Sequence, residues 1–147
     1  MEHRTLDQIT QVASIAPADG RTARTVRRER LRRLTEVLRA YEGPLRLLTR
    51  IEYVPMPERA ELRGEFSPLA LAYQDAPLRR AGLAGDTLGD AMAFFSLSQH
   101  QVHHLFCDCH YGIGVDAKMV AARVSSVAER LSWRERWDKI SAWVRPN

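Results

Sequence analysis

The sequence predicts an all-α protein that forms a single compact domain of five to seven helices. Its 147 residues suit one domain with its own hydrophobic core. Apolar residues recur every three or four positions in several segments, which is typical of one buried helix face. Capping signals and Gly or Pro breaks divide these segments into helices, and no linker separates two domains.

The first 22 residues are expected to form a weakly ordered arm that precedes the helical domain of residues 23–147. The first long helix is predicted over residues 25–42. Leu31, Leu34 and Leu38 share one stripe of this helix, and Gly43 with Pro44 ends it.

The next part of the chain predicts short elements. Residues 44–57 fit a short helix or a short strand, and the pattern leaves both open. A short helix is expected over residues 57–65, with Pro57 at its first position. Ser67 followed by Pro68 is a typical N-cap and first helical residue, so another short helix is predicted there.

Stronger capping signals predict the remaining helices. Asp86 is expected to cap a helix that ends at Phe95. Ser98 and Gln101 form a capping box, with a helix from there to about Cys109. A helix-turn-helix-like corner is therefore expected over about 86–109.

Two more helices are predicted at the end of the chain. Asp116 is expected to cap the first, and a second capping box, Ser132 with Glu135, is expected to open the last. The last helix carries a broad apolar stripe that is expected to pack on the core. The stripe consists of Trp133, Trp137, Ile140 and Val144.

The positive charge of the chain is local. Lys and Arg number 22 against 18 Asp and Glu, a formal charge of +4, and 20 of the 22 bases are arginine. Residues 21–50 alone hold ten arginines and three glutamates, which is +7, so the rest of the chain carries −3. The face opposite the leucine stripe is expected to present arginines. They are Arg28, Arg32, Arg33 and Arg39.

This arginine face has two interpretations. It could contact phosphates, for which the guanidinium fork is well suited. It could also be a solvated face on which Glu29 pairs with Arg33 and Arg32 pairs with Glu36, four residues apart. A high-GC genome would produce the same arginine bias without any function.

The segment DAMAFFSLSQHQVHHLFC resembles the helix-turn-helix pattern of bacterial DNA-binding regulators. Ala91 fits the first helix and Ser96 the turn, and Val102 and Leu105 fit the buried positions of the second helix. The resemblance implies DNA binding, with the arginine face on phosphates. It also implies a set of outward residues that would contact the DNA. These are Ser98, Gln99, His100 and His103.

Residues 100–110 hold four of the five histidines and both cysteines, side chains that zinc and other transition metals prefer. On an intact helix His100, His104 and Cys107 share a face with His103, and they form a possible ligand set. Cys109 is then expected on the opposite, buried face, so that the two thiols point apart.

Two other interpretations of this segment stay open. If the helix ends at Phe106, then Cys107, Cys109 and His110 could converge as a loop site. Otherwise the segment is a polar surface with one buried structural cysteine.

These observations favour a small helical binding or regulatory module without catalytic activity. The preferred hypothesis is DNA binding, and the alternative is a metal-binding protein, a sensor or hydrolase, that uses zinc or another transition metal. A third option is a protein–protein adaptor or homodimer. No apolar run approaches the roughly 20 residues of a membrane span. No signal core begins the sequence, so a cytoplasmic protein with reduced thiols is expected.

Overall fold

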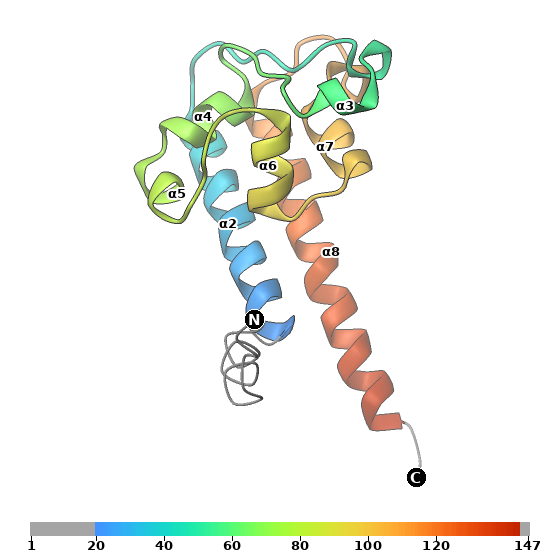
Figure 1. Ribbon diagram of the computed structural model, residues 1–147. Coiled ribbons are helices and arrows are strands. Elements are labelled where there is room, and N and C mark those ends of the chain that lie inside the picture. Colours follow the sequence, from blue (N-terminus) through green and yellow to red (C-terminus); the bar gives the residue numbers. More distant parts are fainter. Residues whose placement is uncertain (1–19, 145–147) are drawn as a thin grey trace, which may run out of the picture.

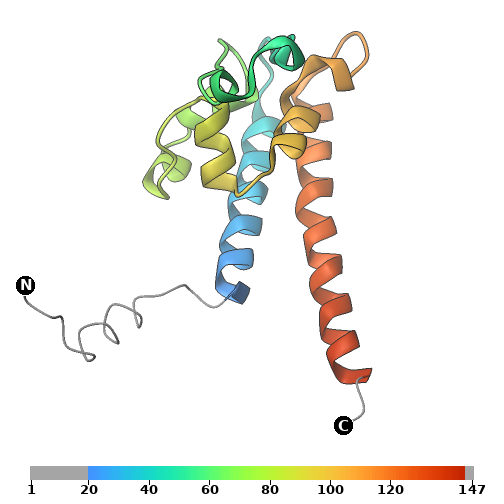
Figure 2. The same cartoon turned by 45° about the vertical axis from the view of Figure 1, so that its right-hand side comes forward.

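The computed structural model describes residues 20–144, and two long antiparallel helices form its frame. Helices α2 (Gly20–Ala40) and α8 (Ala117–Val144) lie side by side in both views (Figures 1 and 2). The shorter elements gather around one end of this pair, while α8 extends past the start of α2 at the other end. In chain order they are η1 (Ile51–Tyr53), α3 (Met56–Arg59), α4 (Pro68–Gln74), α5 (Ala76–Arg80), α6 (Leu88–Phe95), α7 (Gln99–Phe106) and η2 (Asp108–His110).

The core lies where the short helices pack on the frame. The leucine stripe of α2 is fully buried, as are Phe95 of α6 and Phe106 of α7. Burial of each such side chain contributes about 1.5–3 kcal/mol, which explains why the helices collapse into one unit. Over residues 20–144 the structure has seven α-helices and no strand, so the predicted single all-α domain is confirmed. None of these helices combines the length and apolar character needed to cross a membrane.

Several predicted helix starts are confirmed by hydrogen bonds. The Ser67 hydroxyl accepts the N–H of Ala70 at 3.0 Å, with Pro68 as the first residue of α4. Ser98 begins α7 with the predicted capping box, and the Asp116 carboxylate accepts the N–H of Met119 at the start of α8. The first long helix also forms, as α2, but it begins at Gly20 and ends at Ala40, so residues 20–22 belong to the helix and not to the expected arm.

The predicted cap of α6 is wrong by one residue. Thr87, not Asp86, is the N-cap, because its hydroxyl accepts the Asp90 N–H while the Asp90 carboxylate accepts the Thr87 N–H. Asp86 instead pairs with Arg63 at 3.2 Å. The reciprocal box satisfies two N–H groups, whereas a single Asp cap would satisfy one.

The predicted end of α7 is also wrong, since the helix stops at Phe106 rather than near Cys109. Cys107 is extended (φ −92°, ψ 136°) and forms an isolated parallel bridge with Leu48. The Leu48 N–H donates to the Phe106 carbonyl at 2.9 Å, and the Asp108 N–H donates to the Leu48 carbonyl at 3.0 Å. These bonds between distant segments replace the next helical turn.

The structure also settles the segment whose secondary structure stayed open. Residues 44–57 are mostly without regular secondary structure, with the bridge at Leu48 followed by the single turn η1 and the start of α3. The short helix expected over residues 57–65 is present only as α3, which begins at Met56 and ends at Arg59.

The prediction of two helices after Asp116 is wrong, because α8 is continuous through Ser132 and Glu135. No Gly or Pro occurs between residues 117 and 144, so nothing stops the first helix there. Trp137 is 59% exposed, which contradicts its expected place in the core. The side chains of the other stripe residues, Trp133, Ile140 and Val144, and the predicted arm up to residue 19 lie outside the described part of the chain.

Candidate metal centre

The end of α7 lies against the segment that leads into η1, and the Leu48–Cys107 bridge joins the two. Arg50 adopts a left-handed conformation (φ 55°) that turns the chain directly into η1, which carries Glu52. Glu52 is thereby placed next to His103, and the Glu52 Oε2 lies 3.6 Å from the His103 Nε2. Two parts of the chain that are far apart in the sequence therefore supply one polar cluster.

Four side chains form this cluster, which we call the Cys–His cluster: Glu52, His103, Cys107 and Cys109. Their potential ligand atoms all lie within 4.8 Å of one another. The Sγ atoms of Cys107 and Cys109 are 3.0 Å apart, and the Cys109 Sγ is 3.6 Å from the His103 Nε2. Such convergence of two sulfurs, an imidazole nitrogen and a carboxylate matches the donor types of a zinc site.

A second histidine fixes the orientation of the first. The His110 Nε2 lies 2.8 Å from the His103 Nδ1, within hydrogen-bonding distance. With Nδ1 engaged in this way, Nε2 is the nitrogen left facing the sulfurs and Glu52. Metal-binding histidines almost always have such an outer partner, which sets the tautomer and the ring orientation.

The loop that carries His110 is itself held in place. The Arg123 guanidinium of α8 donates to the carbonyls of His104 and His110 and stacks over the Tyr111 ring, 3.8 Å from its centroid. The Tyr111 hydroxyl donates to the Leu105 carbonyl at 2.8 Å. The cluster thus rests on contacts with two helices rather than on the loop alone.

The pKa values of the groups in and beside the cluster are shifted in both directions. Burial, and then the neighbouring Cys109, raise the pKa of Cys107 to about 12. A hydrogen bond from its own backbone N–H, and then His103, lower the pKa of Glu52. Burial, and then His103, lower the pKa of His110, which keeps that ring neutral. A divalent cation between the sulfurs would reverse the effect on Cys107, since it stabilises the thiolate.

Two separations in the cluster can be compared with those of a tetrahedral zinc site. Zinc lies about 2.3 Å from sulfur and about 2.0–2.1 Å from nitrogen, so a tetrahedron sets sulfur and nitrogen about 3.5 Å apart and two sulfurs about 3.8 Å apart. The 3.6 Å between Cys109 and His103 already matches. The sulfurs must separate by about 0.8 Å from their 3.0 Å distance. Cys109 is exposed, so it has room to move.

The structure changes the ligand set expected from the sequence. Of the set His100, His104 and Cys107, only Cys107 belongs to the Cys–His cluster. His104 packs its ring against His110, with centroids 5.1 Å apart, and His100 is exposed. His103 replaces them because its ring points toward η1.

The expectation that the two thiols point apart is wrong. It assumed a helix that continues through Cys109, whereas the extended backbone at Cys107 brings the sulfurs together. Burial is also reversed, because Cys107 is fully buried and Cys109 is exposed. The alternative of a loop site after Phe106 is correct for the two cysteines. His110 is not one of the four clustered donors and instead contacts the Nδ1 of His103. Glu52 carried no sequence signal, because only tertiary folding brings it here.

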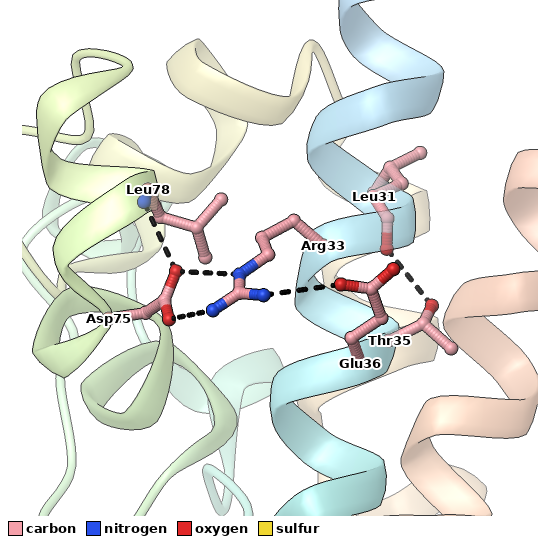
Figure 3. A network of polar contacts seen from close by, with 6 residues as sticks. All are labelled: Leu31, Arg33, Thr35, Glu36, Asp75 and Leu78. Atoms are coloured by element: carbon pink, nitrogen blue, oxygen red, sulfur yellow. Dashed lines mark hydrogen bonds and ion pairs between the residues drawn. The ribbon is translucent and has the colours of Figure 1, made fainter.

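The four arginines predicted as one face of α2 separate into two groups. Arg33 reaches α5, where it forms a bidentate ion pair with Asp75 at 2.7 and 3.1 Å and a further pair with Glu36 at 3.2 Å (Figure 3). The other three line a groove of about 360 Å³ between α2 and α8. The groove is formed by Arg28, Arg32, Thr35, Glu36, Arg39, Ser125, Ala128 and Glu129.

Two further arginines of α2 donate hydrogen bonds to carbonyl groups at the C-terminal end of α6. The sequence did not indicate this role. The Arg27 Nε donates to the Phe95 carbonyl at 3.1 Å, and Arg30 donates to the Phe94 carbonyl at 2.8 Å. The Arg30 guanidinium also lies 4.1 Å from the centroid of the Phe94 ring. Cations at the C-terminal carbonyls of a helix complement its dipole, so these arginines are structural.

The residues expected to read DNA on α7 have mixed environments. The Ser98 hydroxyl caps α7 by accepting the Gln101 N–H at 3.2 Å, and His103 faces the Cys–His cluster. His100 is exposed and Gln99 is half-buried. None of these observations tests DNA binding, which stays a prediction.

Comparisons with protein-family profiles, with curated proteins and with solved structures found no match to this chain.

Proposed function

We propose that this protein is a zinc-binding regulatory module whose metal ligands are Glu52, His103, Cys107 and Cys109. The observation that carries the proposal is the convergence of these four donor atoms within 4.8 Å, with the second nitrogen of His103 already engaged by His110. A surface histidine or a structural cysteine would need neither feature.

The donor set favours zinc over other metals. Two thiolates, an imidazole and a carboxylate suit a borderline cation in tetrahedral geometry, whereas magnesium and calcium prefer oxygen ligands throughout. Four protein ligands also leave no open position for substrate, which is typical of a structural or regulatory site. Glu52, with a side chain 45% exposed, is the ligand most easily exchanged for water.

A metal ion at this place would act on the fold through the segments that it joins. Glu52 lies on η1, while the other three ligands lie on α7 and the loop after it, so the ion cross-links two chain segments already paired at Leu48 and Cys107. Because the unfolded chain does not hold these ligands together, the free energy of binding adds to the stability of the folded state. The reducing cytoplasm expected from the sequence would keep both thiols available.

The test is a titration of the reduced, metal-free protein with zinc, and with cobalt as a spectroscopic substitute. We expect one ion per chain and, with cobalt, the absorption of a tetrahedral thiolate site. His103→Ala and Cys109→Ser should abolish this binding, because each removes a strong ligand.

Matched controls come from the neighbouring histidines. His100→Ala and His104→Ala change the same residue type on the same helix, outside the Cys–His cluster, and should retain one ion per chain. The proposal is wrong if the wild-type chain takes up no stoichiometric metal, or if His103→Ala binds zinc as the wild type does. Loss of binding in His104→Ala with retention in His103→Ala would restore the ligand set expected from the sequence.

A further inference from the structure

We propose that Cys107 and Cys109 are a redox modification site, at which a peroxide joins the two sulfurs in a disulfide and expels the zinc ion. The inference rests on the proposed zinc site and names how that site is regulated. It is carried by the position of the two sulfurs, one buried and one exposed, at 3.0 Å from each other.

The sulfur separation lies between the two states that the proposal connects. A disulfide needs about 2.05 Å between the sulfurs, and tetrahedral zinc needs about 3.8 Å. Movement of about 1 Å in either direction from 3.0 Å reaches one state or the other. The disulfide and the zinc site exclude each other, because zinc is bound by thiolates and the sulfurs of a disulfide are no longer thiolates.

The difference in burial assigns the order of the chemical steps. The exposed Cys109 Sγ attacks hydrogen peroxide, the O–O bond breaks, and Cys109 becomes a sulfenic acid while one water leaves. The Cys107 Sγ, fully buried but in contact, then attacks the Cys109 sulfur and displaces the second oxygen as water. Starting from the zinc-bound state, two thiolates, one peroxide and two protons from water thus give one disulfide, two waters and the released zinc ion, with two electrons passing from sulfur to oxygen.

The backbone indicates which cysteine moves. Cys107 lies between the two hydrogen bonds that flank Leu48, and its own N–H donates to the His103 carbonyl at 3.1 Å, so its backbone is fixed. Cys109 lies in the single turn η2 and is free to approach it. An exposed disulfide of this kind is open to attack by a thiol reductant, so the modification is reversible.

The experiment treats the zinc-loaded protein with hydrogen peroxide and follows two readouts together. A chromophoric chelator reports released zinc, and mass spectrometry of the peptide that contains both cysteines reports the disulfide as a loss of two hydrogen atoms. We expect full release of the ion, in step with disulfide formation, and recovery of zinc binding after reduction. Cys107→Ala, which lacks one proposed ligand and is therefore treated without zinc, should instead stop at an oxidised Cys109, with no disulfide.

The outcomes separate this inference from the proposed function. Zinc binding with no disulfide, or with Cys109 oxidised to sulfinic acid while the Cys107 thiol stays free, overturns the inference and leaves the zinc site standing. A disulfide that forms in a chain unable to bind zinc refutes the zinc site and the coupling with it. Zinc release that precedes disulfide formation also overturns the coupling.

Discussion

The Cys–His cluster and helix α2 are the two regions in which one kind of side chain is concentrated in the sequence. In the folded chain the metal-binding side chains converge, whereas the arginines are spread apart. The first gathers its donors toward one point and adds Glu52 from elsewhere in the chain. The second distributes its cations, with Arg33 bound to α5, Arg27 and Arg30 bound to the end of α6, and others along the groove with α8. A high density of one residue type in sequence therefore predicts a site only when the backbone turns those side chains toward each other.

The largest expected difference between the two regions is in the stabilisation by zinc, which should depend on the Cys–His cluster and not on the arginines of α2. We expect zinc in hundredfold excess over its Kd to stabilise the wild-type chain by about 2.7 kcal/mol, because only the folded state binds it. Cys109→Ser should lose this gain entirely. The double variant Arg32→Ala/Arg39→Ala should keep it, since both residues line the groove and not the cluster. Differential scanning calorimetry with and without zinc measures the effect, and an equal gain in Cys109→Ser would falsify the contrast.

A smaller change should follow from removing the outer histidine. His110→Ala leaves all four proposed ligands but removes the group at 2.8 Å from the His103 Nδ1. We expect a loss of about 10–100-fold in zinc affinity with one ion still bound at saturation. Competition titration against a chelator of known affinity measures this. His100→Ala serves as control, and an unchanged affinity in His110→Ala would show that His110 does not orient the ligand.

Within the arginine-rich region, the Arg33–Asp75 pair should matter for stability alone. The Asp75 carboxylate also accepts the Leu78 N–H and so caps α5 (Figure 3). Asp75→Ala removes both roles and should cost about 1–2 kcal/mol. Asp75→Asn can keep the cap and should cost less than about 1 kcal/mol, because the Arg33 side chain is 42% exposed. Urea unfolding measures both, and zinc affinity should stay at the wild-type value.

The same pair gives a pH dependence with a defined sign. The Arg33 guanidinium lowers the pKa of Asp75 from its ordinary value of 3.8. A lowered pKa in the folded state stabilises the protein above pH 3.8 and loses that effect as the pH falls through the lowered value. The difference in unfolding free energy between wild type and Asp75→Asn should therefore be constant near neutral pH and shrink in acid. A difference that grows in acid would contradict the assignment.

The sequence predicted most of the fold because its local signals agree with the tertiary structure. The leucine stripe of α2 and the caps at Ser67 and Ser98 depend on neighbours within one or two helical turns, which a sequence pattern contains. The end of α7 was missed because it depends on hydrogen bonds to Leu48, far away in the chain. That one error also misplaced the candidate site, since the direction of both thiols follows from where the helix stops.

The DNA-binding hypothesis supplies the last and smallest expected effect, and α2 itself provides its control. We expect the chain to bind a generic duplex weakly, with a Kd of roughly 10⁻⁴–10⁻⁶ M that rises steeply with salt. Arg32→Ala and Arg39→Ala should each reduce the salt slope by about 1, as for a lost phosphate contact. Arg33→Ala should not, because Asp75 and Glu36 already neutralise that guanidinium. Fluorescence anisotropy across a salt series measures all three variants. Equal salt slopes in the three variants would mean that the ion pairs of Arg33 have no bearing on phosphate contact. No binding at low salt would leave the arginines of α2 with structural roles alone.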